Sequence, residues 1–319
     1  MTEINQVPRG PKMANVQQND DLCDNSLKVS GVAIAHTPRN YHKYPGSKYA
    51  LPHDDLERQR LLLQHNTLNN LFEDRFVLAP VSLDHNDKVL DIGTGSGLWI
   101  MDLATGINPS VPIIGVDIEP RLFPASVPKN IEFRVESVTS LPSEWTETFS
   151  LVHQRCLILA LQVHQWSQAI HEIFRVLRPG GWVQLTEVAF WPEGKYPRRP
   201  CMEKLVAIFR RVTEARNLNA DCAYDIPKIL EEAGFVDIQS EARMQCMGKW
   251  AGDIGVANAK NSIGVLGGIK TPVLEAGGFG YVTSEAEYDE LLDGLAKEWD
   301  EIPGIEWEII ITWARKPSA

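Results

Sequence analysis

The fold is decided by the stretch Val89-Leu90-Asp91-Ile92-Gly93-Thr94-Gly95-Ser96-Gly97-Leu98-Trp99. Its apolar run ends abruptly in three glycines at every second position, and helical spacing of apolar residues resumes at Leu98. This pattern predicts a buried strand, a tight turn and a helix. Glycine lets the backbone approach a ligand closely, because a Cβ would obstruct the ligand or forbid the dihedral angles of the turn. The stretch therefore predicts a ligand-binding turn.

The acidic residue before the glycines indicates which ligand the turn binds. A dinucleotide-binding turn has the pattern Gly-x-Gly-x-x-Gly, which places a pyrophosphate on the helix N-terminus. Counted from Gly93 the third glycine would fall at Leu98, and counted from Gly95 it would fall at Ile100, so the pattern fails in both registers. Asp91 would repel a diphosphate, whereas it would attract a ligand with an ammonium group. S-adenosylmethionine has an ammonium group, a ribose and an adenine, and it has no phosphate.

A second carboxylate follows the next predicted strand. The run Ile113-Ile114-Gly115-Val116-Asp117 has the pattern of a buried strand that ends in an acid, and Asp117 lies 20 residues after Gly97. An acid at the end of the second strand reaches a ribose hydroxyl at about this separation, roughly 20 residues. The two motifs together predict that the cofactor is S-adenosylmethionine.

The composition is that of a globular protein that binds neither nucleic acid nor a membrane. Of its 319 residues, 44% are hydrophobic and 23% are charged, which is ordinary for a globular chain. The formal net charge of −11 argues against a nucleic-acid surface, because neutralising phosphates requires a basic face. No apolar run reaches the length of about 18 residues that a membrane span needs, and Met1 to Asn25 lack the apolar core of a signal peptide.

The cysteines indicate the compartment. There are five of them, widely scattered and without a Cys-x-x-Cys pair, which is typical of reduced intracellular thiols. We therefore expect a cytoplasmic protein, with the nucleus as the alternative. The Cys, His and acidic residues show no metal-ligand spacing, so no metal site is expected. A small-molecule substrate is the expected partner, and the sequence leaves the oligomeric state open.

Alternating strand and helix patterns from Asn86 onward predict an α/β fold, a doubly wound, seven-stranded and mostly parallel sheet. The expected strands cover residues 88–92, 113–117, 131–135, 149–153, 182–188, 235–247 and 306–314. The expected helices begin at Asp54 and Leu98 and cover residues 166–177, 200–217, 226–233 and 284–299. Ligands bind at the carboxyl ends of the strands in such a sheet.

The predicted domain organisation has three parts. Residues 1–40 are rich in Asn, Gln, Asp and Pro and are expected to form a mobile tail. Residues 41–85 are expected to form N-terminal lid helices, the first of them opened by the capping box Asp54-x-x-Glu57. Residues 86–319 then form the cofactor-binding domain, with cap insertions at about 189–225 and 248–305. Insertions at strand ends usually build a lid or a substrate pocket.

Five motifs carry a resemblance to a known family, and they are spread over the chain from Tyr49 onward. They are Tyr49-x-Leu51-Pro52-x-Asp54-x-x-Glu57-x-x-Arg60-Leu61-x-x-Gln64-His65, the turn from Asp91 to Gly97, Gly115-x-Asp117, Leu151-Val152-His153-Gln154-Arg155 and Arg175-Val176-Leu177-Arg178-Pro179-Gly180-Gly181-Trp182. In these motifs the chain resembles the class I S-adenosylmethionine-dependent methyltransferases, a family with a Rossmann-like fold. Within that family it looks like the fungal secondary-metabolism group that includes LaeA-type proteins.

The resemblance also implies a set of cofactor-binding residues. The methionine end would be held by Asp91 and the glycine turn, the ribose by Asp117, and the adenine by Ile118 and by the segment after the third strand. In many relatives an Asp in that segment meets the adenine amine, and Ser137 stands at its position here. The cofactor-binding residues so predicted are Tyr49, Asp91, Gly93, Thr94, Gly95, Asp117, Ile118, Ser137, Val138 and Gln154.

Several further side chains are candidates for chemistry or for substrate contact, and each has a structural alternative. His153, which the resemblance places beneath the sulfonium with Gln154, is a candidate general base or else a packed histidine. His65 is a second candidate base or else a helix-packing residue. Tyr44 and Tyr49 would cover the site or simply pack a proline-rich loop. Aromatic side chains can stack on an aromatic substrate or fill the protein core. Trp191 and Trp250 are the two candidates for stacking on a substrate.

We therefore expect an enzyme that transfers the methyl group of S-adenosylmethionine to an O, N or S atom of a small, apolar secondary metabolite. Two alternatives remain open. The first is a LaeA-like regulator that binds the cofactor and acts through a protein partner. The second is an enzyme that uses the sulfonium only as a positive charge, to assist a reaction such as a rearrangement.

Overall fold

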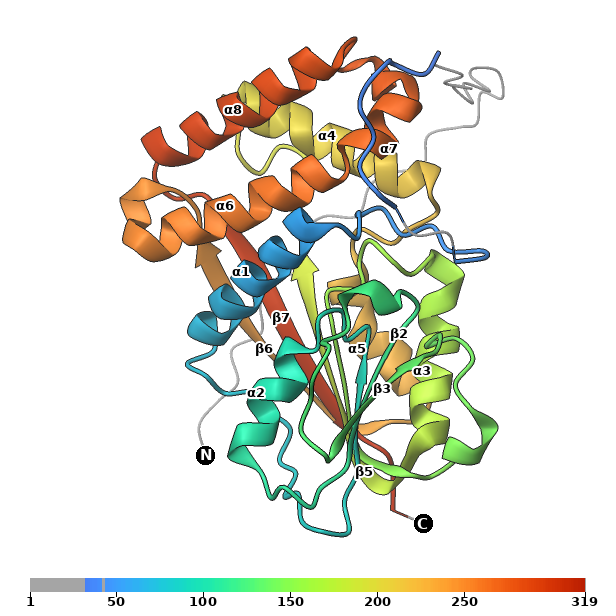
Figure 1. Ribbon diagram of the computed structural model, residues 1–319. Helices are drawn as coiled ribbons and strands as arrows, with labels where there is room; N and C mark the ends of the chain where they lie inside the picture. The colour runs from blue at the N-terminus through green and yellow to red at the C-terminus, as the bar shows by residue number, and fades with distance from the viewer. Residues whose placement is uncertain (1–31, 42–43, 319) are drawn as a thin grey trace, which may run out of the picture.

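A seven-stranded sheet runs through the centre of the computed structural model, which describes residues 32–41 and 44–318 (Figure 1). The strands are β1 (Val89–Ile92), β2 (Ile113–Asp117), β3 (Ile131–Val135), β4 (Phe149–Arg155), β5 (Leu177–Ala189), β6 (Val236–Cys246) and β7 (Glu306–Arg315). They are arranged in the order β3-β2-β1-β4-β5-β7-β6, and β7 is antiparallel to both of its neighbours. The predicted mostly parallel, doubly wound sheet is confirmed.

Three helices cover the two faces of the sheet: α2 (Leu98–Gly106) on one face, and α3 (Val163–Val176) and α5 (Cys222–Glu232) on the other. Alternate residues of β4 face the two layers, because side chains alternate along a strand. Leu151 packs in a cluster with Trp99 of α2, whereas Val152 packs in a cluster with Trp166 of α3. Burial on both faces explains why the central strands are almost continuously apolar.

Five further helices lie together at one end of the sheet and form what we call the helical layer (Figure 1). They are α1 (Asp55–Leu71), α4 (Pro200–Ala215), α6 (Gly252–Gly268), α7 (Lys270–Glu275) and α8 (Glu285–Glu301). Within the layer α1 packs on α6, and α4 packs on α8. Four short 3-10 segments, Pro120–Leu122, Ser143–Trp145, Lys249–Ala251 and Gly277–Gly280, complete the helical structure of the described residues.

The observed element boundaries depart from the predicted ones where a cap or turn was not recognised. Helix α3 begins at Val163 instead of Trp166, because Gln162 and Gln165 form a capping box ahead of it. Strand β5 follows directly after α3, so the motif from Arg178 to Gly181 opens the strand and does not form a separate loop. Helix α5 also begins four residues before the predicted position.

Part of the predicted N-terminal tail is instead packed against the helical layer. Residues 1–31 lie outside the described residues, but the backbone N–H of Ile34 donates to the carbonyl of Leu274 at 2.9 Å. Further along, the guanidinium of Arg39 pairs with the carboxylate of Asp54 at 2.5 Å. Ile34 and Arg39, which fall within the segment expected to be a tail, thus contact residues far along the chain.

Among the described residues of the predicted lid region 41–85, Asp55–Leu71 form one α-helix, α1. Asp54 caps this helix as expected, since its Oδ1 accepts from the backbone N–H of Glu57 at 3.0 Å. The side chain of Glu57 does not complete a capping box. It pairs with Arg60 one turn later, with Nη2 2.7 Å from Oε1.

Candidate functional site

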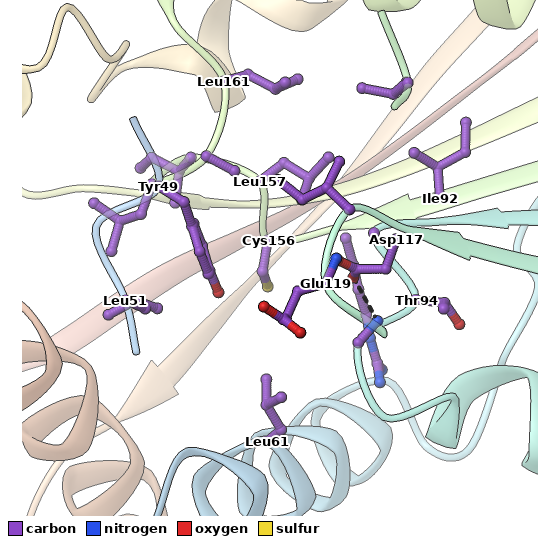
Figure 2. A pocket seen from close by; sticks show the side chains of 18 of the residues that line it. Tyr49, Leu51, Leu61, Ile92, Thr94, Asp117, Glu119, Cys156, Leu157 and Leu161 are labelled. Atoms are coloured by element: carbon purple, nitrogen blue, oxygen red, sulfur yellow. Dashed lines mark hydrogen bonds between the residues drawn. The ribbon is translucent and has the colours of Figure 1, made fainter. Parts of the chain in front are cut away.

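A cavity of about 340 Å³ lies between the carboxyl ends of the strands and the helical layer (Figure 2). Figure 2 shows Tyr49 and Leu51 on one side of it and Asp117 and Thr94 on the other. Its polar end lies over β1 to β3 and is lined by Gly93, Thr94, Gly95, Ser96, Asp117, Ile118, Glu119, Ser137 and Val138. Its largely apolar end lies over β5 to β7 and is lined by Leu51, Leu68, Val188, Phe190, Phe209, Val265, Trp307 and Ile309, together with the amide side chains of Gln245 and Asn261.

The glycine turn after β1 brings bare backbone to the polar end. Gly95 and Gly97 have φ angles of +54° and +73°, which side-chain-bearing residues rarely adopt. A Cβ on Gly97 would lie 2.5 Å from Cζ of Phe133, so the turn would have to move. A Cβ on Gly95 would have only Leu61 near it, at 3.6 Å across the cavity. The turn therefore requires glycine for its own geometry and for access to a ligand.

Asp117 is the last residue of β2, and its carboxylate supports the glycine turn. Its Oδ2 accepts from the backbone N–H of Gly95 at 2.9 Å, and its Oδ1 accepts from that of Glu119 at 3.0 Å. Burial raises the pKa of Asp117 to about 6, against the lowering effect of these two hydrogen bonds. Because a carboxylate can accept about four hydrogen bonds, both oxygens keep capacity for ligand hydroxyls.

Five other predicted residues also line the cavity. Ile118 and Val138 face its polar end, while Tyr44 and Tyr49 come from the segment before α1. Burial raises the pKa of Tyr49 far above its usual range, so its hydroxyl stays protonated. Ser137 also lines the cavity, but its hydroxyl lies 2.9 Å from Oγ1 of Thr139 and accepts from the Thr139 backbone.

Asp91 and His153 are not among the residues that line the cavity. They are register partners on β1 and β4, so their side chains point to the same face of the sheet, the one that α2 covers. There Nδ1 of His153 lies 2.7 Å from Oδ1 of Asp91, and its ring stacks on Trp99 with centroids 3.6 Å apart. Burial lowers the pKa of His153. Asp91 and His153 therefore form a buried polar pair in this structure, and the role of His153 as a base stays a prediction.

His65 and Gln154 are likewise turned away from the cavity. Nε2 of His65 lies 2.8 Å from Oδ2 of Asp102, while its Nδ1 accepts from the guanidinium of Arg155 at 2.9 Å. Burial and the charge of Arg155 lower the pKa of His65. Gln154 is fully buried and donates from Nε2 to Oε1 of Glu187 at 3.4 Å. Neither residue is among those that line the cavity, and their contacts with cofactor or substrate stay predictions.

The two tryptophans predicted to stack on a substrate also lie outside the cavity lining. Trp191 is buried, donates from Nε1 to the carbonyl of Glu306 at 2.7 Å, and packs edge-on against Trp307 with centroids 4.6 Å apart. Trp250 sits in the 3-10 segment Lys249–Ala251. It is Trp307, on β7, that reaches the cavity.

The segment after β4 contributes residues that the sequence analysis missed. Arg155, Cys156 and Leu157 line the cavity, and Cys156 has a φ of +58°, which turns the chain sharply across the sheet edge. Glu187 on β5 holds this turn, because its carboxylate accepts from the backbone N–H groups of Leu157 at 2.7 Å and Ile158 at 3.1 Å. Arg155 does stand in one of the quoted motifs, but strand periodicity alone does not tell which side chain reaches a cavity.

The arrangement of turn, carboxylate and cavity agrees with the sequence comparisons. Residues 89–181 match a family model described as a methyltransferase domain. The chain is 28% identical over 277 residues to the N-methyltransferase gliN of Aspergillus fumigatus, covering 84% of this chain and 96% of that protein. It is 30% identical over 227 residues to the N-methyltransferase sirN of Leptosphaeria maculans, covering 70% and 79%.

A regulatory protein is also similar to this chain. The secondary metabolism regulator LAE1 of Hypocrea atroviridis is 26% identical over 223 residues, covering 67% of this chain and 63% of that protein.

Within residues 32–41 and 44–318, no helix is long and apolar enough to cross a membrane.

Proposed function

Because the chain belongs to the class I S-adenosylmethionine-dependent methyltransferases, in the fungal secondary-metabolism group that includes LaeA-type proteins, we propose that it methylates a nitrogen atom of a small, largely apolar molecule. The observation that carries the proposal is a cavity with two chemically different ends, one polar beside the glycine turn and one apolar beneath the helical layer. A cofactor and an apolar acceptor would meet where the ends join, beside Cys156 and Leu157. The names of two relatives support nitrogen as the acceptor atom.

The residues at the polar end fit S-adenosylmethionine. Asp117 would accept hydrogen bonds from the ribose hydroxyls, and Ile118 and Val138 would pack against the adenine. The backbone of the glycine turn, from Gly93 to Gly95, would lie against the methionine portion. When bound, the cofactor supplies a methyl group that its positively charged sulfur already activates for displacement.

The apolar end favours an acceptor that needs no general base. Among the described residues, its lining side chains include no Asp, Glu or His. Burial raises the pKa of Cys156 to about 12, so its thiol stays protonated. A neutral amine presents a lone pair without assistance, whereas an alcohol needs a base to remove its proton. The contribution of the protein would then be to align the nitrogen with the methyl group and to exclude water.

The experiment that tests this proposal is a product analysis with a matched set of acceptors. Apolar amines would be incubated with the protein and S-adenosylmethionine, beside the alcohol and thiol of the same skeleton. We expect S-adenosylhomocysteine and the methylated amine in equal amounts, measured by mass spectrometry. Cofactor binding without S-adenosylhomocysteine from any acceptor would contradict the proposal and favour a regulator such as LAE1. A rearranged product without S-adenosylhomocysteine would favour sulfonium-assisted chemistry.

Filling the apolar end is expected to stop turnover and to spare cofactor binding. Val188 lies on β5 and lines that end, and Val188→Trp would displace the acceptor. Since a misplacement of about 1 Å can lower a rate roughly 100-fold, we expect kcat/KM to fall by at least that factor. Calorimetry should give a cofactor affinity within about threefold of the wild type. Val236→Trp, at an exposed position of β6, is the control, and equal effects of both substitutions would contradict the assignment.

Cofactor affinity is expected to depend on pH through Asp117. Burial raises its pKa to about 6, and ribose hydroxyls donate to the ionised form, so affinity should be lost as the pH falls through 6. With a group of that pKa, the affinity at pH 5 should be about tenfold below that at pH 7. Calorimetric titration of S-adenosylhomocysteine at the two pH values measures the change. An affinity that stays flat or rises on acidification would contradict the role of Asp117.

A further inference from the structure

A guanidinium without a carboxylate partner lines the cavity beside the glycine turn. Arg155 is the last residue of β4, and it lines both the main cavity and a smaller cleft of about 30 Å³. Among the described residues, its side-chain hydrogen bond runs from Nη2 to the ring atom Nδ1 of His65, at 2.9 Å. The ion pairs among the described residues do not include Arg155.

A second arginine on the same cavity shows the contrast. Arg60 is fully compensated, because its Nε and Nη2 donate to the carboxylate of Glu57 and its Nη1 donates to Oδ1 of Asn261 at 3.0 Å. Burying a charge without a counter-ion is strongly unfavourable, so such a group is expected to meet an anion in its working state. Arg155 therefore lacks a carboxylate partner of the kind that Arg60 has in Glu57.

The charged groups around Arg155 are occupied elsewhere. The carboxylate of Asp91 is bonded to His153, and that of Asp102 is bonded to Nε2 of His65 at 2.8 Å. Because Nε2 of His65 faces Asp102, its Nδ1 presents a lone pair that holds the guanidinium in place. Burial lowers the pKa of Arg155, which is the direction expected for a cation without a close counter-ion.

The position of Arg155 indicates which anion it meets. Ile92 and Gln154 are register partners, so Arg155 stands one residue beyond the end of β1, level with Gly93 of the turn. The nucleoside of the cofactor would extend away from this point, toward Asp117 and the segment after β3. The apolar acceptor end lies on the other side, over β5 to β7. The methionine portion is therefore the part of the ligand that comes nearest to the guanidinium.

We propose that the guanidinium of Arg155 binds the α-carboxylate of the methionine portion of the cofactor. This inference rests on the proposed function, because it requires the cofactor to lie along the glycine turn. Paired donors of a guanidinium match the two oxygens of a carboxylate, and such charge-assisted hydrogen bonds are among the strong ones. A carboxylate on the acceptor has the same chemistry, and the experiment below separates the two sources.

The test compares two ligands that differ only at the amino-acid end. S-adenosylhomocysteine carries the α-carboxylate, whereas 5′-methylthioadenosine keeps the nucleoside and the sulfur but lacks the amino-acid end. Arg155→Met is expected to weaken binding of S-adenosylhomocysteine by about 10- to 150-fold, the range for a hydrogen-bonded charged group. Its binding of 5′-methylthioadenosine should stay within about threefold of the wild type. Both affinities are measured by calorimetry on the full chain.

Arg134→Met is the matched control, since this arginine lies on β3 and pairs with Glu132 at the surface. Unchanged binding of S-adenosylhomocysteine by the Arg155 variant, or an equal loss for both ligands, would overturn the inference. So would a loss confined to the KM of a carboxylate-bearing acceptor, which would assign the guanidinium to the acceptor. If Arg155→Met does not fold, Arg155→Lys takes its place, because it keeps the charge without the paired donors. The affinity of the Lys variant for S-adenosylhomocysteine should fall, whereas its affinity for 5′-methylthioadenosine should not. A wild type that binds neither ligand would refute the proposed function itself.

Discussion

Asp117→Ala is expected to weaken binding of S-adenosylhomocysteine by at least about 100-fold. In the proposed cofactor complex the substitution would remove two charge-assisted hydrogen bonds to the ribose, each contributing roughly 1.5–3 kcal/mol. It also releases the backbone N–H groups of Gly95 and Glu119, which the carboxylate now holds at 2.9 and 3.0 Å. The turn would therefore lose both its ligand contact and its support.

Calorimetry on the purified variant measures this effect, with Glu132→Ala as the control. Glu132 lies on the neighbouring strand β3, where it pairs at the surface with Arg134 and does not reach the cavity. We expect the control to bind as tightly as the wild type. An affinity of the Asp117 variant within threefold of the wild type would show that the ribose is held elsewhere.

Glu187→Ala is expected to lower the free energy of unfolding by roughly 2–6 kcal/mol. The carboxylate of Glu187 is 1% exposed and accepts from the backbone N–H groups of Leu157 and Ile158. Leaving a buried donor without a partner costs about 1–3 kcal/mol, and two donors are affected here. Since a folded domain is stable by only about 5–15 kcal/mol, this loss is a large share of the total.

Urea denaturation measures the loss, and Glu193→Ala, at an exposed site beyond the end of β5, serves as the control. The pH dependence gives an independent check with Glu187→Gln. Burial raises the pKa of Glu187 from 4.5 to about 8, so the folded protein binds this proton more tightly than the unfolded chain. The resulting stabilisation is complete below about pH 4.5 and is lost as the pH rises to 8. The Gln variant should lack this dependence, and an unchanged pH profile would contradict the assignment.

Cofactor affinity should follow stability in the Glu187 series, because the segment that Glu187 holds forms part of the cavity wall. Stability and site are therefore coupled at the turn after β4. The sequence contains a hint of this coupling, since Glu187 stands within the predicted strand 182–188 and an acid is almost never fully buried unless it is paired. The hydrogen bonds from the backbone N–H groups of residues 157 and 158 explain why the acid is buried there.

Local sequence patterns were sufficient to predict the sheet and the polar end of the cavity. A strand, a glycine turn and a following helix depend on residues that are neighbours in the chain, so periodicity and glycine spacing predict them. The same holds for Asp117, whose place follows from the end of its own strand. Ile118 and Val138, predicted from the family resemblance, also lie at the cavity.

Tertiary structure decided which side chains reach the cavity, and this could not be predicted from the sequence. Asp91 and His153 stand at strand ends like Asp117, yet the register between β1 and β4 turns both toward α2, where they bond to each other. Two residues after His153, the chain ends β4 and Arg155 lines the cavity instead. Strand register and the packing of the helical layer arise from contacts between distant segments. The sequence by itself therefore determined the fold and the glycine turn that lines the cavity, whereas the long-range contacts decided the remaining lining of the site.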